Sequence, residues 1–254
     1  MLQRPLLECP EYRRKITVAP QLLIVISTYN ERQSLPRLVE EIWRYLPQAK
    51  VLVVDDNSPD GTGQWVTQRS ESEPRIELLH RDSKQGLGVA TISGIKLALT
   101  QNPDWIGTMD ADLSHRPKDL AKMWEAAQTA CADVIIGSRY TSGGSITNWS
   151  LSRRLASRGV NFFARWVLWL TTRDNSSALR IYRGNTLKQL DLSQVDCRGY
   201  AYLEQMLLHL RRAGARFQEI PIEFSDRVDG ESKVSVAEVF RNLRDILYLA
   251  VRRT

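Results

Sequence analysis

The segment Asp110-Ala111-Asp112 follows an apolar run at residues 105–109. Two carboxylates two residues apart at the end of a strand can approach one cation from the same side. Mg²⁺ and Mn²⁺ accept one or two such carboxylates together with diphosphate oxygens, and the metal neutralises the charge that builds on a nucleotide diphosphate as it leaves. We therefore expect Asp110 and Asp112 to bind Mg²⁺ or Mn²⁺, although this short pattern is also common outside metal sites.

Polar residues follow two further apolar runs. Tyr29 and Glu31 come after residues 22–27, and Asp56 comes after residues 51–54 in a segment that reads DDNSPDGT. These residues could simply begin a turn and cap the next helix. The carboxyl ends of parallel strands meet at one edge of a sheet, however, and ligands bind there. Their shared position favours a nucleotide-diphosphate site.

The elements that would position these residues alternate along the chain. Short apolar runs predict buried strands at residues 22–27, 51–54, 76–79, 105–109 and 134–136. Between them, helical spacing of apolar residues predicts helices such as 34–46, 87–100 and 117–130. This alternation predicts an α/β fold with a mostly parallel sheet. A helix at 200–213, a strand at 217–224 and a helix at 236–252 complete the prediction.

Composition narrows the class of protein. The net charge of +6 favours anionic partners, but nucleic acid is not expected, because the chain has no DNA- or RNA-binding motif and its predicted rim is acidic. Three separated cysteines indicate free thiols in a reducing cytoplasm. No apolar run approaches the roughly 20 residues of a spanning helix. We therefore expect a cytoplasmic protein that can lie on a membrane without crossing it.

The motifs TYNE, VVDDNSPDGT, KQGLG, MDADLSH, GSRYTSGG, SRGVN and DRVDGESK, in this order, resemble those of dolichyl- and polyprenyl-phosphate mannosyltransferases of glycosyltransferase family 2. The resemblance spans residues 22–252. It implies the Rossmann-like GT-A fold over residues 21–235, between an irregular lead-in at 1–20 and a C-terminal amphipathic helix at 236–254. The implied reaction is metal-assisted, inverting transfer of a sugar from a nucleotide diphosphate, with GDP-mannose as the expected donor, to a polyprenyl or dolichyl phosphate.

The resemblance also implies four groups of site residues. The base and ribose would be held by Tyr29, Glu31, Val54 and Asp56, and the diphosphate and metal by Asp110, Ala111 and Asp112. The acceptor phosphate would be held by Arg139, Arg153 and Ser157. The fourth group, Arg227 and Lys233, would close a loop over the donor. Arginine suits phosphate because its planar fork donates two hydrogen bonds, whereas lysine acts as a point charge. Without the resemblance, the last group would be interpreted as a solvated basic loop. Asp112, Arg139 and Arg153 are the expected catalytic residues.

The sequence departs from the family pattern at four places. Ser27 replaces a proline, Ser114 stands where some relatives have a metal-assisting residue, and the segments 175–180 and 203–205 differ in several positions. These changes leave two alternatives open. One is transfer to a hydroxyl acceptor, for which Glu204 is the candidate base. The other is a non-catalytic nucleotide-sugar binder.

The segment VNFFARWVLWL at residues 160–170 predicts contact with a membrane. Its apolar and aromatic residues are expected to form one broad face with arginines beside it, as in interfacial helices on anionic lipid. The alternative is a buried core helix. We expect peripheral association with the inner face of a membrane, directly or through a membrane-anchoring partner.

Overall fold

The central sheet of the computed structural model contains seven strands in the order β3-β2-β1-β4-β7-β5-β8. The structure describes residues 20–195, 201–226 and 236–251. The strands and helices are, in chain order, β1 (Leu22–Thr28), α1 (Ser34–Tyr45), β2 (Lys50–Asp55), α2 (Thr62–Ser70), β3 (Ile76–His80), α3 (Leu87–Thr100), β4 (Trp105–Asp110), α4 (Pro117–Thr129), β5 (Val134–Ser138), β6 (Ser145–Thr147), α5 (Leu151–Leu168), β7 (Arg180–Arg183), α6 (Gly184–Leu187), α7 (Tyr202–Arg212), β8 (Phe217–Pro221), β9 (Glu223–Ser225) and α8 (Val236–Val251).

Six strands of this sheet run in one direction, and β7 runs against them. β1 pairs in parallel with β2 and β4, β2 pairs in parallel with β3, and β5 pairs in parallel with β8. β7 is antiparallel to both neighbours, β4 and β5. The predicted α/β fold with a mostly parallel sheet is therefore confirmed, but the sequence analysis did not predict β7.

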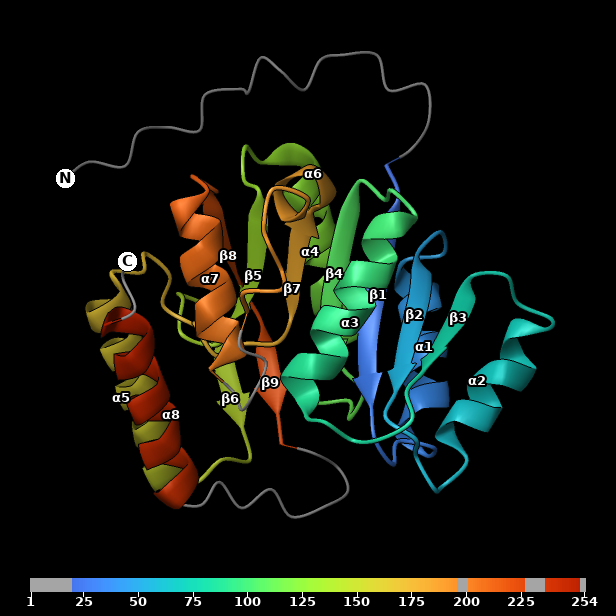
Figure 1. Cartoon of the computed structure of the whole chain (residues 1–254), viewed down its shortest axis with the longest axis horizontal. Helices are drawn as coiled ribbons and strands as arrows, with labels where there is room; N and C mark the ends of the chain where they lie inside the picture. Colours follow the sequence, from blue (N-terminus) through green and yellow to red (C-terminus); the bar gives the residue numbers. More distant parts are fainter. Residues whose placement is uncertain (1–19, 196–200, 227–235, 252–254) are drawn as a thin grey trace.

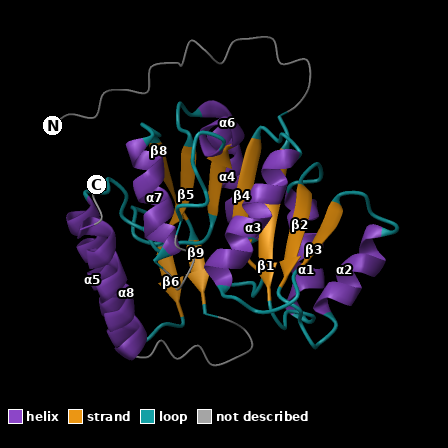
Figure 2. Ribbon diagram, viewed as in Figure 1, coloured by secondary structure: helices purple, strands orange, loops and turns teal. Residues whose placement is uncertain are grey.

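Alternate residues of each strand enter different cores, because successive side chains of a strand point to opposite faces. In β1, Leu23 and Val25 belong to the core cluster that also contains residues of α3, α5, α7 and α8. Ile24 and Ile26 pack with α1, α2 and α4 on the other face. Figures 1 and 2 show this layering, with α3 and α7 in front of the sheet and α1 and α4 behind it.

The second half of the chain extends beyond the main sheet. The predicted strand 217–224 divides at Ile222 into β8, which pairs with β5, and β9, which pairs with β6 in a small parallel sheet. The helices α5 and α8 pack together at one end of the molecule (Figure 1). Among the described residues, no helix is both long enough and apolar enough to cross a membrane.

Candidate active site

The ends of β1, β2 and β4 lie side by side at the carboxyl edge of the sheet. The register pairs Ser27 of β1 with both Val54 of β2 and Asp110 of β4. A residue in the left-handed conformation follows each strand: Asn30 (φ 62°), Asn57 (φ 56°) and Leu113 (φ 61°). Asparagine adopts this conformation more readily than leucine does. All three predicted motifs therefore turn sharply at the same edge, where ligands of such sheets bind.

Hydrogen bonds join the loop after β1 to the loop after β2. Three backbone N–H groups of the first loop donate to three side chains of the second: Asn30 N to Ser58 Oγ (3.0 Å), Glu31 N to Thr62 Oγ1 (3.1 Å) and Arg32 N to Asp60 Oδ2 (3.0 Å). The polar residues of the DDNSPDGT segment therefore hold the first loop in place as one rigid part of the rim.

The neighbouring carboxylates Asp55 and Asp56 have different surroundings. Asp55 is buried and accepts hydrogen bonds from the Thr28 hydroxyl (3.0 Å) and from the backbone and side chain of Ser58. Asp56 pairs with Arg81, whose Nη1 lies 2.7 Å from its Oδ1. Burial raises the pKa of Asp56, although Arg81 opposes that shift. Asp55 therefore supports the loop, and Asp56 is held beside a cation at the rim.

The other residues expected at the base and ribose also differ in exposure. The Tyr29 ring is partly exposed, and Lys84 Nζ lies 3.8 Å from its centroid. Glu31 accepts a hydrogen bond from the Ser34 hydroxyl. Val54 is fully buried, so its side chain belongs to the core and not to the rim. The structure thus gives Tyr29 and Glu31 accessible positions but corrects the placement of the Val54 side chain.

Asp110, the last residue of β4, and Asp112 flank the buried Ala111. Asp112 Oδ1 accepts hydrogen bonds from the backbone and hydroxyl of Ser114, and the Asp110 side chain is 30% exposed. His115, which sequence reasoning left without a role, lies with Nε2 3.5 Å from Asp110 Oδ2. Two hard carboxylate ligands at an open edge fit Mg²⁺ or Mn²⁺, which takes further oxygens from a diphosphate and water.

Asp110 and Asp112 supply few protein ligands for a metal ion within the described part of the chain. No group of three or more His, Cys, Asp and Glu side chains there could hold a metal ion. Mg²⁺ bound by one or two carboxylates usually completes its coordination with water and substrate phosphate oxygens.

Arg139 and His115 both lie against one aromatic ring, that of Phe224. The Phe224 ring has the His115 ring at a centroid distance of 5.1 Å and the Arg139 guanidinium at 5.3 Å. Arg139 donates from Nε and Nη2 to the two carboxylate oxygens of Asp174, both at 2.7 Å. Burial alone would lower the pKa of Arg139, but Asp174 outweighs burial and raises it. The negative charge of Asp110 also raises the pKa of Arg139, so Arg139 interacts electrostatically with the acidic edge.

The other two residues expected at the acceptor phosphate lie on the first half of α5. Arg153 Nη1 pairs with Asp226 Oδ2 at 2.7 Å. The Ser157 hydroxyl accepts a hydrogen bond from the Tyr140 hydroxyl at 2.6 Å. Tyr140 follows Arg139 in the chain, so this hydrogen bond links the segment that carries Arg139 to Ser157. Arg153 is thus already engaged by a carboxylate in the structure.

Arg227 and Lys233 lie outside the residues that the structure describes, so their predicted roles stay predictions.

Sequence reasoning missed the polar network behind Arg139. Its members are Asn161 on α5 and the loop residues Asp174, Asn175 and Ser176, which follow that helix. Asn161 Oδ1 accepts from the backbone N–H groups of Asn175 (2.6 Å) and Ser176 (3.2 Å), while Asn161 Nδ2 donates to the Ser176 hydroxyl (3.0 Å). Two signals were present: Asn161 ends the SRGVN motif, and Asp174 immediately precedes the segment 175–180, which departs from the family pattern.

Glu204, the candidate base for a hydroxyl acceptor, is fully buried on α7. Neither of its carboxylate oxygens has a hydrogen-bond partner among the described residues. Burial raises its pKa to about 7, although the Arg180 guanidinium opposes the shift. A group sealed in this way does not meet an acceptor, so the structure does not favour Glu204 as a base.

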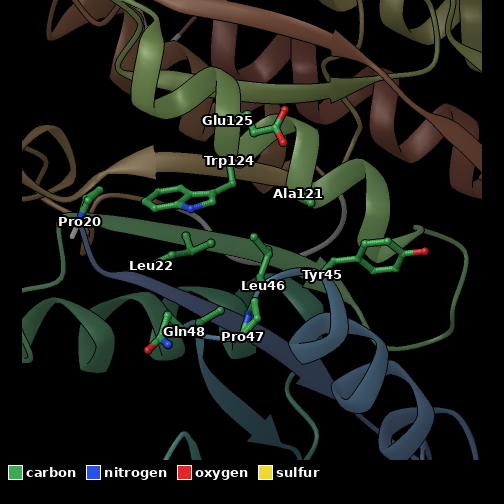
Figure 3. Close-up of a pocket in the computed structure, with 10 residues that line it drawn as sticks. Pro20, Leu22, Tyr45, Leu46, Pro47, Gln48, Ala121, Trp124 and Glu125 are labelled. Carbon is green, nitrogen blue, oxygen red and sulfur yellow. The ribbon is translucent and has the colours of Figure 1, made fainter.

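A cavity of about 270 Å³ lies at the opposite edge of the sheet. Figure 3 shows Leu22 and Leu46 on one side of it and Trp124 of α4 on another. Leu22 is the first residue of β1, so this cavity is at the amino ends of the strands. It is therefore separate from the acidic edge.

The α5 surface corrects one expectation. Phe162, Trp166 and Trp169 are 73%, 73% and 67% exposed. Phe163 and Val167 pack against the core instead. The aromatic residues of this segment therefore divide between two faces of the helix and do not form a single one.

Residues 23–191 match the family model described as glycosyl transferase family 2. The chain belongs to glycosyltransferase family 2. Within this family, it is 41% identical over 215 residues to an undecaprenyl-phosphate mannosyltransferase of Micrococcus luteus, a match that covers 85% of this chain and 88% of the relative. It is 37% identical over 235 residues to the polyprenol monophosphomannose synthase of Mycolicibacterium smegmatis, covering 91% and 87%.

Solved structures agree with the GT-A fold of this glycosyltransferase. Glucosyl-3-phosphoglycerate synthase from Mycobacterium tuberculosis, solved with Mn²⁺ and UDP, superposes with a TM-score of 0.64 at 15% identity, covering 92% of this chain and 80% of that one. The mannosyltransferase PcManGT from Pyrobaculum calidifontis, solved with GDP-Man and Mn²⁺, superposes with a TM-score of 0.56 at 15% identity, covering 94% and 74%. At these identities, the likeness concerns the fold.

Proposed function

We propose that this glycosyltransferase transfers a mannosyl group from GDP-mannose to a polyprenyl phosphate, with inversion and with the help of Mg²⁺ or Mn²⁺. The observation that carries the proposal is that the Phe224 ring contacts both Arg139 and His115, and that His115 lies beside Asp110 at the acidic edge. Arg139 would then bind the acceptor phosphate, and the acidic edge would bind the metal and the donor diphosphate at a neighbouring position. The names of the two mannosyltransferase relatives support the choice of sugar and acceptor.

A phosphate acceptor suits the side chains of this site. A lipid phosphate is already ionised near neutral pH, so transfer depends on placement and on neutralising the leaving group more than on a general base. Asp110 and Asp112 would hold the metal, which supplies charge neutralisation at the diphosphate when bound. Tyr29, Glu31 and Asp56 would hold the nucleoside, and Arg139, Arg153 and Ser157 would orient the acceptor phosphate.

We further propose that α5 and α8 seat the protein peripherally on the inner face of a membrane. Side chains exposed on these helices include the large apolar residues Leu151, Leu155, Phe162, Trp166, Trp169, Leu247, Tyr248 and Val251. Arg158 and Arg165 are exposed on α5 as well. An apolar stripe with interspersed arginines binds at the headgroup level of anionic lipid.

The deciding experiment is transfer of radiolabelled mannose from GDP-mannose into organic-extractable lipid, with a polyprenyl phosphate and Mn²⁺ present. The expected product is extractable and depends on the metal. UDP-glucose in place of GDP-mannose tests the donor, and the matching polyprenol in place of its phosphate tests the acceptor. Label that stays in the aqueous phase for every donor, with correctly folded protein, would sink the proposal.

A further inference from the structure

The Ser176 hydroxyl receives two hydrogen bonds from groups that can only donate. Arg139 Nη2 lies 2.8 Å from Ser176 Oγ, and Asn161 Nδ2 lies 3.0 Å from it. The orientation of the Asn161 amide is fixed, because its Oδ1 accepts two backbone N–H groups. A serine hydroxyl has two acceptor sites and one proton. Both acceptor sites are therefore occupied, and the proton must be donated elsewhere.

Within the described part of the chain, the Ser176 hydroxyl donates to no protein acceptor. Ser176 is partly exposed, whereas Asn161 and Asp174 behind it are buried. The guanidinium of Arg139 polarises the hydroxyl and strengthens it as a donor. Arg139 uses Nε and Nη2 for Asp174 and Ser176, and its Nη1 also donates to no described residue. The Ser176 hydroxyl proton and the Arg139 Nη1 donors therefore lie close together, because Arg139 and Ser176 are themselves joined by a hydrogen bond.

We propose that Ser176 is a further binding residue for the acceptor, donating its proton to an anionic oxygen of the lipid phosphate beside Arg139. Asn161 is its positioning residue, because the Asn161 amide keeps the Ser176 proton directed away from the protein. This inference rests on the proposed function for the class of acceptor. It gives a role to the SRGVN motif and to a segment in which this chain departs from its relatives.

The test uses farnesyl phosphate as a short-chain acceptor and measures its Kd by isothermal titration calorimetry. Ser176→Ala should weaken binding by about 10- to 150-fold, the range of one hydrogen bond to a charged group. Ser176→Thr keeps the hydroxyl and should restore binding. The matched control is Ser177→Ala at the next position, whose hydroxyl is buried without a partner, and it should bind as wild type does.

Asn161→Asp tests the positioning role. It places an oxygen where Nδ2 now donates, so Ser176 turns its proton inward and farnesyl phosphate binding falls although Ser176 is unchanged. A thermal melt accompanies each variant, and Ser176→Ala remains decisive if Asn161→Asp does not fold. Equal Kd values for wild type and Ser176→Ala, or no binding of farnesyl phosphate to wild type, would overturn the inference. Binding that depends on Ser176 without mannosyl transfer would instead refute the proposed function alone.

Discussion

Phe162 and Phe163 are adjacent in the sequence but face opposite surroundings on α5. Phe162 is 73% exposed, and Phe163 packs against the core with α8. An α-helix turns by about 100° per residue, so two neighbours at the edge of an apolar stripe can separate in this way. The proposed membrane binding should therefore be separable from folding by mutation.

Phe162→Ser with Trp166→Ser should weaken binding to vesicles that contain anionic lipid and leave the melting temperature nearly unchanged. Each exposed aromatic ring contributes at roughly 25 cal/mol per Å² of apolar area that leaves water. Residual binding from the arginines should fall as salt rises. Co-sedimentation at low and high salt measures both effects. Phe163→Ser is the matched control and should lower the melting temperature; wild-type sedimentation of the double variant would refute the membrane-binding face.

Asp112→Asn should abolish the extra stabilisation that Mn²⁺ gives to the GDP complex and should leave the free protein folded. The amide keeps the oxygen that accepts hydrogen bonds from Ser114, so the turn survives while the negative charge is lost. Thermal shift with GDP, with and without Mn²⁺, measures the effect. An unchanged metal-dependent shift would remove Asp112 from the proposed metal site.

Asp174→Ala should lower the free energy of unfolding by about 3–5 kcal/mol, because it leaves the Arg139 guanidinium buried without its partner. The two side chains are 6% and 0% exposed. Glu41→Ala removes an exposed partner of Arg37 and is the control, with an expected cost of about 0.5 kcal/mol or less. Urea denaturation compares the two. If both variants lost the same free energy of unfolding, burial would not be what makes the ion pair of Arg139 and Asp174 stabilising.

Glu204 should make the protein less stable as pH rises from about 5 to 8. Its folded pKa of about 7 lies above the ordinary value of 4.5, so between these values the folded state binds more protons than the unfolded state. Stability therefore falls as pH increases across this window. Glu204→Gln should flatten the pH dependence and raise the melting temperature at pH 8. Parallel pH profiles for the two proteins would show that Glu204 titrates normally.

The first half of the fold was predictable because its pattern is simple. Strands such as β1 are continuous apolar runs, as expected for strands covered on both faces, and the acidic residues stand where those runs end. β7 escaped prediction because it is short and begins with Arg180, a fully buried charge that interrupts the apolar pattern. Arg180 is tolerated there because it donates to three backbone carbonyls, of Ser177, Leu203 and Asn175. Two of these carbonyls lie close to Arg180 in the sequence, but Leu203 comes from α7, and a local pattern does not reveal that contact.

The candidate site was predictable to a similar degree. Chemistry at a strand end depends on residue type and local spacing, so Asp110 and Asp112 could be placed from the sequence. The Arg139 network depends on α5 meeting the loop at residues 171–179, a tertiary contact. Val54 was expected among the residues that hold the base and ribose, but its side chain is buried in the core. A residue close to a functional edge in sequence can still point into the core.

The position of β7 in the sheet has a consequence for how the nascent chain folds. β1 to β4 are neighbours of one another, so residues up to 110 contain a complete four-stranded parallel sheet. Among the described strands, β5 pairs with β7 and β8 alone, and both are synthesised later. Until β7 and β8 have been synthesised, β5 is an unpaired apolar strand, and such a strand is prone to aggregation. The strands β1 to β4 can therefore pair early during synthesis, whereas β5 completes its pairing only after residues 180–221 have been made.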